Sequence, residues 1–316
     1  MIDRGLMLVT VLALVAVSLA AEAQLAGPVR TIGIIGHTQA TPFEEGLRDL
    51  GWVEGKNVRF ERRATTDIRK LAQFAAELVR MRVDVIFAGN APATRAAVEA
   101  TRAIPIITVS TDPVDAGVAS SLARPGSNVT GFAITQLTGK RLEILVQALP
   151  TARRVALLVN PTNPNTPVYR REAETVAHAI GVKLLVFEVS TPERIVDVIA
   201  AVAKSRPGAF VASGDPLFWA TRQQLIEAVA RHRLPTMWES RRFVEAGGLI
   251  SYGADPGELY RRAATYADRI LKGTKPADLP IEQATNFELA INLKTAHALS
   301  ITIPPPVLLR ADRVVQ

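Results

Sequence analysis

The sequence predicts an α/β protein made of two similar, doubly wound parallel-sheet lobes, joined by a hinge that the chain crosses several times. Three pairs of segments in the two halves match in the same order, at offsets of 124 to 130 residues. They are residues 30–36 with 154–160, 84–90 with 209–215, and 104–107 with 234–237. Short apolar runs also alternate with helical patterns of about 10–15 residues, which is typical of βαβ units. Two such lobes leave a cleft between them, and such clefts bind small ligands.

Strands and helices alternate through the first half. Short apolar runs rich in β-branched residues predict strands at residues 31–35, 58–61, 83–88, 104–109 and 129–134. Helices are predicted at 42–50, 68–81 and 93–101. Gly51 ends the first helix, as glycine does at many helix C-termini, and the second helix carries its large apolar residues on one face. Right-handed crossovers then place helices on both faces of the sheet.

The second half repeats this scheme. Strands are predicted at 155–159, 183–189, 209–212, 235–238 and 249–252, and helices at 140–149, 168–180, 192–205 and 220–232. A long amphipathic helix follows at 258–271, and Gly273 and Pro276 stop it. The tail contains the segment 287–293, a helix near 294–299 and three consecutive prolines at 304–306.

The long helix and the tail exceed what a simple tandem of two domains needs. We therefore interpret them as returns of the chain, with crossings near Thr135, Gly253 and Gln283. In this interpretation, lobe 1 comprises residues 28–134 and 253–282, and lobe 2 comprises residues 135–252 and 283–316. Hinges of a few residues permit two lobes to close over a ligand.

The N-terminal residues predict a cleavable signal peptide. Arg4 supplies a positive charge, residues 6–19 are almost entirely apolar, and residues 21–23 read Ala-Glu-Ala, a small-x-small cleavage site. Residues 1–23 are therefore expected to be removed, leaving Gln24 first. The alternative is an uncleaved membrane anchor, but the apolar run is shorter than the roughly 20 residues that span a bilayer.

The chain contains no cysteine. This excludes a disulfide framework, a thiolate metal site, a cysteine nucleophile and a lipid-modified cysteine anchor. Export without a lipid anchor predicts a soluble protein of a bacterial periplasm. The absence of free thiols fits that oxidising compartment.

The formal net charge is +7, which raises the question of nucleic-acid binding. The basic residues are scattered and not gathered into a stripe, so no nucleic-acid partner is expected. A net positive field could still favour anionic ligands. At 48% hydrophobic and 21% charged residues, the chain is typical of a globular protein.

Signatures of catalysis are missing from the sequence. It contains neither G-x-S-x-G nor G-x-G-x-x-G, and its four histidines lack the spacing of metal ligands. We therefore predict no catalytic residue, no metal and no cofactor. A hydrolytic site assembled from scattered carboxylates stays open as an alternative.

Asp or Asn recurs at the carboxyl ends of the predicted strands. The candidates for ligand contact are Asn90, Asp112, Asn160 and Asp215. In a parallel sheet, ligands bind beside these strand ends, and the following helix N-termini can receive a carboxylate or phosphate. The alternative is that each residue only caps the helix that follows it, because Asp or Asn before proline is typical of a helix start.

Further candidates occupy equivalent places at strand ends. His37 and Thr38 follow the first strand, and the alternative for them is a solvated loop. Phe132, Trp238 and Tyr252 are aromatic residues at strand ends that either stack on a ligand or pack in the core. Glu239 could pair with a ligand cation, or it is an ordinary surface carboxylate.

Several segments resemble one known family. Residues 45–58, 112–114, 123–131 and 287–296 together are similar to the substrate-binding proteins of ABC transporters, in the branch that includes TrpX-like, tryptophan-binding proteins. The resemblance implies the type I periplasmic-binding fold, no catalysis, and delivery of a small molecule to a membrane permease. It places Asp112 and Asn90 at the cleft. The loop at 89–92 reads Gly-Asn-Ala-Pro where many relatives have Thr, so tryptophan is not carried over as the ligand.

Together these observations predict the periplasmic substrate-binding component of an ABC importer. The ligand is expected to be a small organic solute, amino-acid-like or an aromatic or organic acid, held in the cleft between the lobes. The expected partner is an ABC permease in the inner membrane, and the chain is expected to be a monomer. Two alternatives stay open: a ligand-sensing receptor that signals to a membrane sensor, and an exported α/β enzyme.

Overall fold

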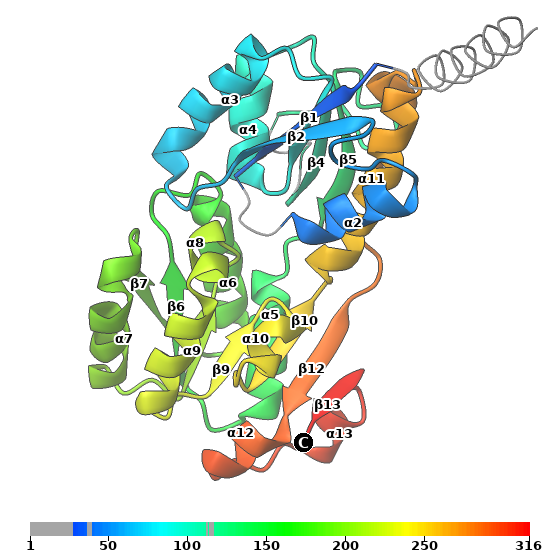
Figure 1. Ribbon diagram of the computed structural model, residues 1–316. Coiled ribbons are helices and arrows are strands. Elements are labelled where there is room, and N and C mark those ends of the chain that lie inside the picture. Colours follow the sequence, from blue (N-terminus) through cyan, green and yellow to red (C-terminus); the bar gives the residue numbers. More distant parts are fainter. Residues whose placement is uncertain (1–27, 37–39, 112, 114–116) are drawn as a thin grey trace, which may run out of the picture.

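The protein forms two α/β lobes stacked end to end, each built around its own sheet (Figure 1). The computed structural model describes residues 28–36, 40–111, 113 and 117–316. The predicted signal peptide and the candidates His37, Thr38 and Asp112 lie outside the described residues. The predicted fold class, two doubly wound α/β lobes with a hinge crossed several times, is confirmed.

The first lobe contains a sheet of six described strands, all parallel, in the order β11-β5-β4-β3-β1-β2. In chain order they are β1 (Arg30–Ile35), β2 (Val58–Arg63), β3 (Val85–Ala88), β4 (Ile106–Thr111), β5 (Val129–Ile134) and β11 (Ile281–Gln283). Their side chains alternate between two buried layers, because helices cover both faces. Helices α2 (Thr41–Asp49) and α11 (Pro256–Leu271) cover one face. Helices α3 (Leu71–Arg80) and α4 (Ala91–Ala100) cover the other.

The second lobe contains a sheet of seven described strands in the order β13-β12-β10-β9-β8-β6-β7. They are β6 (Arg154–Val159), β7 (Lys183–Glu188), β8 (Ala209–Ala212), β9 (Thr236–Trp238), β10 (Ile250–Gly253), β12 (Glu288–Asn292) and β13 (Arg313–Val315). Helices α5 (Thr138–Ala148) and α6 (Thr166–Ala179) pack on one face, with α12 (Leu293–Ala298) and α13 (Pro305–Leu308) beside them. Helices α7 (Ile195–Lys204), α8 (Pro216–Ala220), α9 (Arg222–Arg231) and α10 (Arg241–Glu245) contribute to the layer on the other face.

The sequence repeat falls on strands that take equivalent places in the two sheets. The order β2-β1-β3-β4-β5 of the first sheet corresponds to β7-β6-β8-β9-β10 of the second. The three matched pairs of segments are β1 with β6, β3 with β8, and β4 with β9. Two similar sheets therefore explain why the matches share their order and offset.

The chain passes between the sheets three times among the described residues, between β5 and α5, between β10 and α11, and between β11 and β12. The third passage departs from the expected parallel sheets, because β12 pairs antiparallel with β10, with Glu288 opposite Gly253. The chain reaches β12 from the first lobe, so it enters the second sheet at the edge that faces the cleft. From there it can only run away from the cleft, against the direction of β10.

The region after β8 also differs from the sequence-based expectation. One helix was expected at 220–232, but the chain forms two, the short α8 and then α9. The side chain of Asp215 accepts a hydrogen bond from the Leu217 backbone N–H, and Pro216 follows it, so the helix begins earlier than expected. This start places Trp219 close to the ends of the strands.

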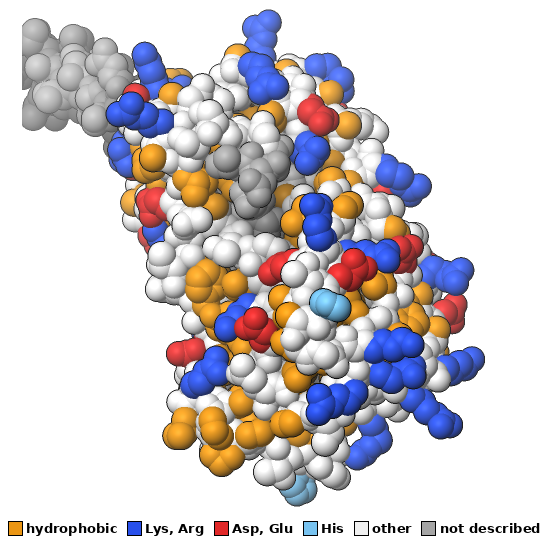
Figure 2. Space-filling model, turned by 180° about the vertical axis from the view of Figure 1, so that it is seen from behind, with side chains coloured by type: hydrophobic (Ala, Val, Ile, Leu, Met, Phe, Trp, Pro, Cys, Tyr) orange, Lys and Arg blue, Asp and Glu red, His pale blue; other side chains and the backbone are white. Residues whose placement is uncertain are grey.

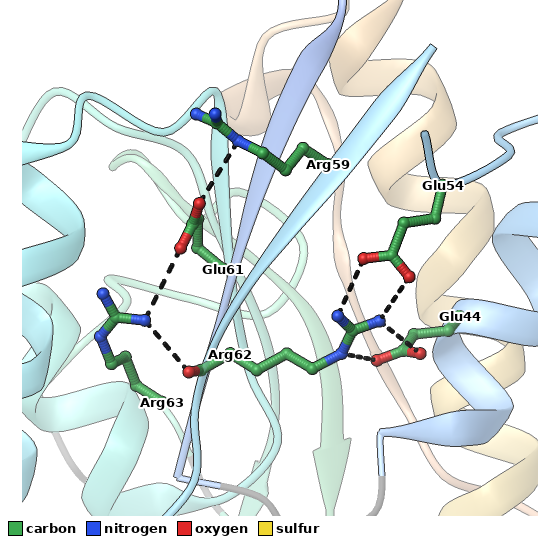
Figure 3. Close-up of polar contacts among 6 residues, drawn as sticks. All are labelled: Glu44, Glu54, Arg59, Glu61, Arg62 and Arg63. Carbon is green, nitrogen blue, oxygen red and sulfur yellow. Dashed lines mark hydrogen bonds and ion pairs between the residues drawn. The ribbon is translucent and has the colours of Figure 1, made fainter. Parts of the chain in front are cut away.

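Strand β2 is an edge strand, and charged side chains cover it on both sides (Figure 3). On one side Arg62 joins two carboxylates, with Nε 2.9 Å from Glu44 Oε1 and Nη1 2.9 Å from Glu54 Oε1. On the other side Glu61 lies between Arg59 at 3.3 Å and Arg63 at 3.7 Å. Charges on an exposed edge oppose pairing with a strand of another chain, and the bond to Glu44 ties β2 to α2.

Seen from behind, the lysine and arginine side chains are spread over both lobes and do not form a stripe (Figure 2). None of the helices in the described part of the chain combines the length and the apolar character needed to cross a membrane.

Candidate functional site

A cavity of about 120 Å³ lies between the two lobes, at the carboxyl ends of their strands. Because about 10–15 Å³ holds one water molecule, the space suits a solute of roughly the size of an amino acid. Both lobes line it. The first lobe contributes Gly36, Pro42, Thr65, Thr66, Gly89, Asn90, Ala91, Pro92, Val109, Ser110, Ile134 and Tyr260, and the second contributes Arg141, Asn163, Tyr169, Gly214, Asp215, Pro216, Trp219, Ala220, Glu239 and Arg242, with Thr135, Gln136, Ala254, Pro256 and Gly257 at the crossings.

Asp215 is a buried carboxylate at the end of β8, with only 3% of its surface exposed. It accepts hydrogen bonds from Asn163 Nδ2 at 2.7 Å, from Asn160 Nδ2 at 3.1 Å and from the Leu217 N–H at 2.8 Å. Burial raises its pKa to about 6, although these three donors oppose the shift. The residue therefore caps α8 and also gives the cavity a carboxylate.

Glu239 is the second carboxylate of the cavity and follows β9 directly. It accepts a hydrogen bond from the Trp219 indole N–H. Burial raises its pKa, and the positive charge of Arg141 opposes that shift. A side chain at residue 214 would collide with the Glu239 carboxylate, so Gly214 makes room for it.

Arg141 is the buried cation of the cavity and lies in the first turn of α5. Its Nε donates to the Tyr252 carbonyl oxygen at 2.8 Å, on the strand that leads to the second crossing. Burial lowers its pKa, while the charges of Glu239 and Glu172 oppose the shift. Arg242 on α10 is a second, half-buried guanidinium in the wall.

Three aromatic side chains complete the wall: Tyr169, Trp219 and Tyr260. The Tyr260 hydroxyl donates to the Gly89 carbonyl oxygen at 2.9 Å, which ties α11 to the end of β3, and burial raises its pKa. Trp219 is oriented by Glu239 and packs edge-on against Phe243. Flat apolar faces beside charges of both signs suit a solute that combines a ring or apolar part with polar groups.

Asn90 lines the cavity from the first lobe and also caps a helix. Its Oδ1 accepts from the Ala93 N–H at 2.9 Å, and its Nδ2 donates to the Gly36 carbonyl oxygen at 2.8 Å. Behind it, the hydroxyls of Thr94, Thr108 and Ser110 form a buried chain that ends at Ser110 in the cavity wall. The hydroxyl chain thereby holds Ser110 in place at the cavity wall.

The structure brings three of the predicted site residues into the cavity wall, Asn90, Asp215 and Glu239. Asn160 lies one layer behind them, 1% exposed and bonded to Asp215. No group of three or more His, Asp or Glu side chains in the described residues is arranged to hold a metal ion.

The three aromatic candidates do not line this cavity, and their contacts match the alternative that they pack against other side chains. Phe132 is 1% exposed and packs against Tyr266, beneath the Arg262 guanidinium. Trp238 stacks on Phe243 at 4.7 Å. Tyr252 packs against Phe287 at the crossings. Phe132 and Trp238 thus turn toward helices α11 and α10, where their rings are buried.

Sequence reasoning missed Arg141, Tyr169, Trp219, Tyr260 and Arg242, all of which lie on helices. A search confined to strand ends could not find them. Tyr260 and Arg141 did carry a signal, because each lies in the first turns of a helix next to a predicted crossing.

Comparison with known proteins identifies relatives of this chain. The family model described as ABC transporter substrate binding protein matches residues 37–315. A tyrosine-binding protein of Clostridioides difficile (strain R20291) is 26% identical over 261 residues, which cover 82% of this chain and 75% of that protein.

Solved structures agree with this assignment. A conserved domain protein of Vibrio cholerae superposes with a TM-score of 0.82 at 27% identity, covering 92% of this chain and 99% of that one. An ABC domain of Streptococcus pneumoniae in complex with L-Trp gives a TM-score of 0.81 at 25% identity, covering 91% of this chain and all of that one. With a cavity between two lobes and a family model that spans nearly its whole length, this chain belongs to the substrate-binding proteins of ABC transporters.

Proposed function

We propose that this protein captures a small organic solute in the cavity between its lobes and delivers it to an ABC permease of the inner membrane. One observation carries the proposal: both lobes line a single cavity that holds buried charges of both signs. A ligand that contacts both lobes favours the closed arrangement through contacts that exist only there. Binding and release then need no chemical change in the solute.

The cavity favours an amino-acid-like solute. The carboxylates of Asp215 and Glu239 suit an ammonium group, the guanidiniums of Arg141 and Arg242 suit an acid group, and Tyr169, Trp219 and Tyr260 suit a ring. The similarity to a tyrosine-binding protein and to a domain in complex with L-Trp supports this class. An aromatic acid without an ammonium group would use the guanidiniums and the rings alone.

Within this proposal, Asn90, Asp215 and Glu239 contact the ligand, and Asn160 acts by orienting Asp215. His37, Thr38 and Asp112 are proposed as further contacts on the basis of the sequence alone.

A thermal-shift screen of the mature protein tests the proposal. The panel contains amino acids, aromatic acids, sugars and nucleosides. A solute at about 100 times its Kd stabilises the folded state by about 2.7 kcal/mol, so a true ligand raises the Tm in proportion to the logarithm of its concentration. Recovery of the bound solute unchanged distinguishes binding from catalysis. If only sugars or nucleosides raise the Tm, the proposed ligand class is wrong.

Export to the periplasm is the second part of the proposal. It rests on Arg4, the apolar residues 6–19 and the Ala-Glu-Ala site at 21–23. Expression of the full chain in a Gram-negative host should release into the periplasmic fraction a protein that begins at Gln24, as read by intact mass and N-terminal sequencing. A product that retains residues 1–23 in the membrane fraction would instead indicate an anchor.

A further inference from the structure

Arg141 stands out among the charged residues of the cavity because it is buried and only partly bonded. Only 4% of the surface of Arg141 is exposed. The Nε atom donates to the Tyr252 carbonyl oxygen at 2.8 Å, and the two terminal nitrogens have no hydrogen-bond partner among the described residues. Five described side chains have a fully buried polar atom without a hydrogen-bond partner, and Arg141 is not one of them. The terminal nitrogens of Arg141 therefore face the cavity that the residue lines.

This arrangement is costly for the protein without a ligand. A buried guanidinium stays charged, and a buried charge needs a close partner to offset its lost hydration. Glu239 and Glu172 stabilise the charge from a distance, but neither forms an ion pair with Arg141 within 4.0 Å. Among the described residues, no anion lies within ion-pair distance of the terminal nitrogens.

The neighbouring backbone holds the guanidinium in a fixed orientation. The bond to the Tyr252 carbonyl oxygen fixes one edge of the group. At Gly253 a side chain would collide with the Glu239 carbonyl oxygen and would lie 3.4 Å from Arg141 Nη2. The strand end therefore leaves space for the guanidinium between the hinge and the cavity. A planar, pre-oriented group with two free nitrogens matches the two oxygens of a carboxylate.

We infer that Arg141 is the residue that binds the carboxylate of the ligand, through both terminal nitrogens, and that it makes the protein selective for acids over the corresponding amides. The inference rests on the proposed function and adds to it the group of the solute that is recognised. Arg141 is preferred over Arg242 for this role. Arg242 is half-buried and lies beside Gly257, whereas Arg141 is enclosed, so a bond to Arg141 is better shielded from water.

Glu239 gives the same site a negative charge. Its carboxylate also lines the cavity, accepts the Trp219 indole N–H, and forms no ion pair with Arg141 within 4.0 Å. A solute with an ammonium and a carboxylate group can offer the first to Glu239 and the second to Arg141, whereas the uncharged amide group of the corresponding amide leaves Arg141 without its anion. The preference for acids should therefore reside in Arg141 alone.

The test compares three acid–amide pairs by isothermal titration calorimetry: L-tyrosine with L-tyrosinamide, L-tryptophan with L-tryptophanamide, and benzoate with benzamide. The wild-type protein should bind the acid of at least one pair about 10- to 100-fold more tightly than the amide, the range expected for hydrogen bonds to a charged group. In Arg141→Gln the acid should lose this advantage while the amide keeps its affinity. The preference of Arg141→Lys for the acid should lie between those of the wild type and Arg141→Gln, because lysine keeps the charge but cannot form the paired hydrogen bonds.

Lys140→Gln is the matched control. Lys140 is the neighbouring residue of α5, carries the same charge, and forms an exposed pair with Glu143 at 2.9 Å outside the cavity. Its variant should keep the wild-type preference for acids, which shows that the loss in Arg141→Gln is not a general effect of net charge.

The outcomes separate the two proposals. If a wild-type acid binder keeps its preference in Arg141→Gln, the role of Arg141 is wrong and the proposed function stands. If the wild-type protein binds an amide as tightly as its acid, the inference falls even when Arg141→Gln does not fold. If none of the six solutes binds the wild-type protein, the proposed ligand class fails, and the inference fails with it.

Discussion

At the scale of single residues, the cavity owes its character to charges that the protein has partly removed from water. Asp215 is stabilised by two asparagine side chains and one backbone N–H, yet burial still raises its pKa to about 6. Each of these charges costs stability in the free protein and becomes useful when a solute of opposite charge enters. The residues of the site therefore trade some stability for recognition.

The pH dependence of stability should reveal Asp215. Its pKa is about 6 in the folded state and 3.8 in the unfolded state, so the folded protein holds this proton more tightly. The proton on Asp215 therefore contributes most to the free energy of unfolding below pH 4. This contribution falls by about 3 kcal/mol between about pH 4 and 6 and is constant at higher pH. Urea unfolding of wild type and Asp215→Asn from pH 3.5 to 8 should show this fall in the wild type and not in the variant. Parallel curves for the two proteins would contradict the assignment.

Glu239 should contribute to binding more than to stability. Glu239→Gln keeps an oxygen for the Trp219 indole but removes the negative charge. We expect affinity for an ammonium-bearing solute to fall about tenfold or more, since a hydrogen bond to a charged group is worth about 1.5–3 kcal/mol. Calorimetry with L-tyrosine and with benzoate separates the effects, because only L-tyrosine carries an ammonium group. Exposed Glu245→Gln is the control, and equal losses for both solutes would argue against this role.

At the scale of elements, close backbone contacts position the site. Strand β5 lies against β4 at Gly131, which is opposite Thr108. Its φ of +131° favours glycine, and any Cβ there would collide with the Thr108 carbonyl oxygen. The next residues of β4 carry Ser110 into the cavity wall. The register of these two strands therefore decides where the hydroxyl chain ends.

Gly131→Ala should accordingly be strongly destabilising. The positive φ and the collision with Thr108 together should lower the free energy of unfolding by about 2–5 kcal/mol. Gly51→Ala is the control, because its φ of +91° is also positive but nothing lies within 4 Å of the added Cβ. It should lose only about 1–2 kcal/mol. Urea unfolding measures both, and equal losses would show that the approach to Thr108 is unimportant.

The second and third crossings are held together by side chains as well as by the chain itself. Arg241 on α10 pairs with Asp255 at 3.1 Å on the second crossing and with Glu288 at 3.5 Å beside the third. Tyr252 and Phe287 pack together in the same region. These two crossings thus form one connected unit, and Arg141 is bonded to it through the Tyr252 carbonyl oxygen, at the point where the lobes would rotate.

At the scale of the whole molecule, the two similar lobes explain why a cavity lies at the middle of the chain. Each lobe presents the carboxyl ends of its strands, with their helix N-termini and caps, to the other. Only when both lobes meet is the cavity complete, because Asn90 and Tyr260 come from one side and Asp215, Glu239 and Arg141 from the other.

A ligand should therefore compact the molecule. We expect the radius of gyration from small-angle X-ray scattering to be larger without solute and to decrease when a solute identified by thermal shift is added. The concentration at half-effect should match the Kd from calorimetry. A radius that stays constant at saturation would contradict closure of the lobes on the solute.

Much of the fold was predictable because its signals are local. Apolar runs such as 155–159 and capping residues such as Asp215 specify strands and helix starts within a few positions. The antiparallel β12 and the short α8 were not predicted, since the direction of β12 depends on where the chain returns from the other lobe. Of the site, strand-end residues such as Glu239 were predictable, because parallel strands end at one edge.

By itself, the sequence determined two repeated α/β lobes and polar residues at the edge where they meet, because strand period, helix period and capping are properties of neighbouring residues. Only the tertiary structure decided which side chains share the cavity. Phe132 and Trp238 turn into the cores, while Arg141 and Trp219 reach the cavity from helices. The direction of a helical side chain depends on how that helix packs against its sheet and on how the lobes face each other, and neither is encoded in any short stretch of sequence.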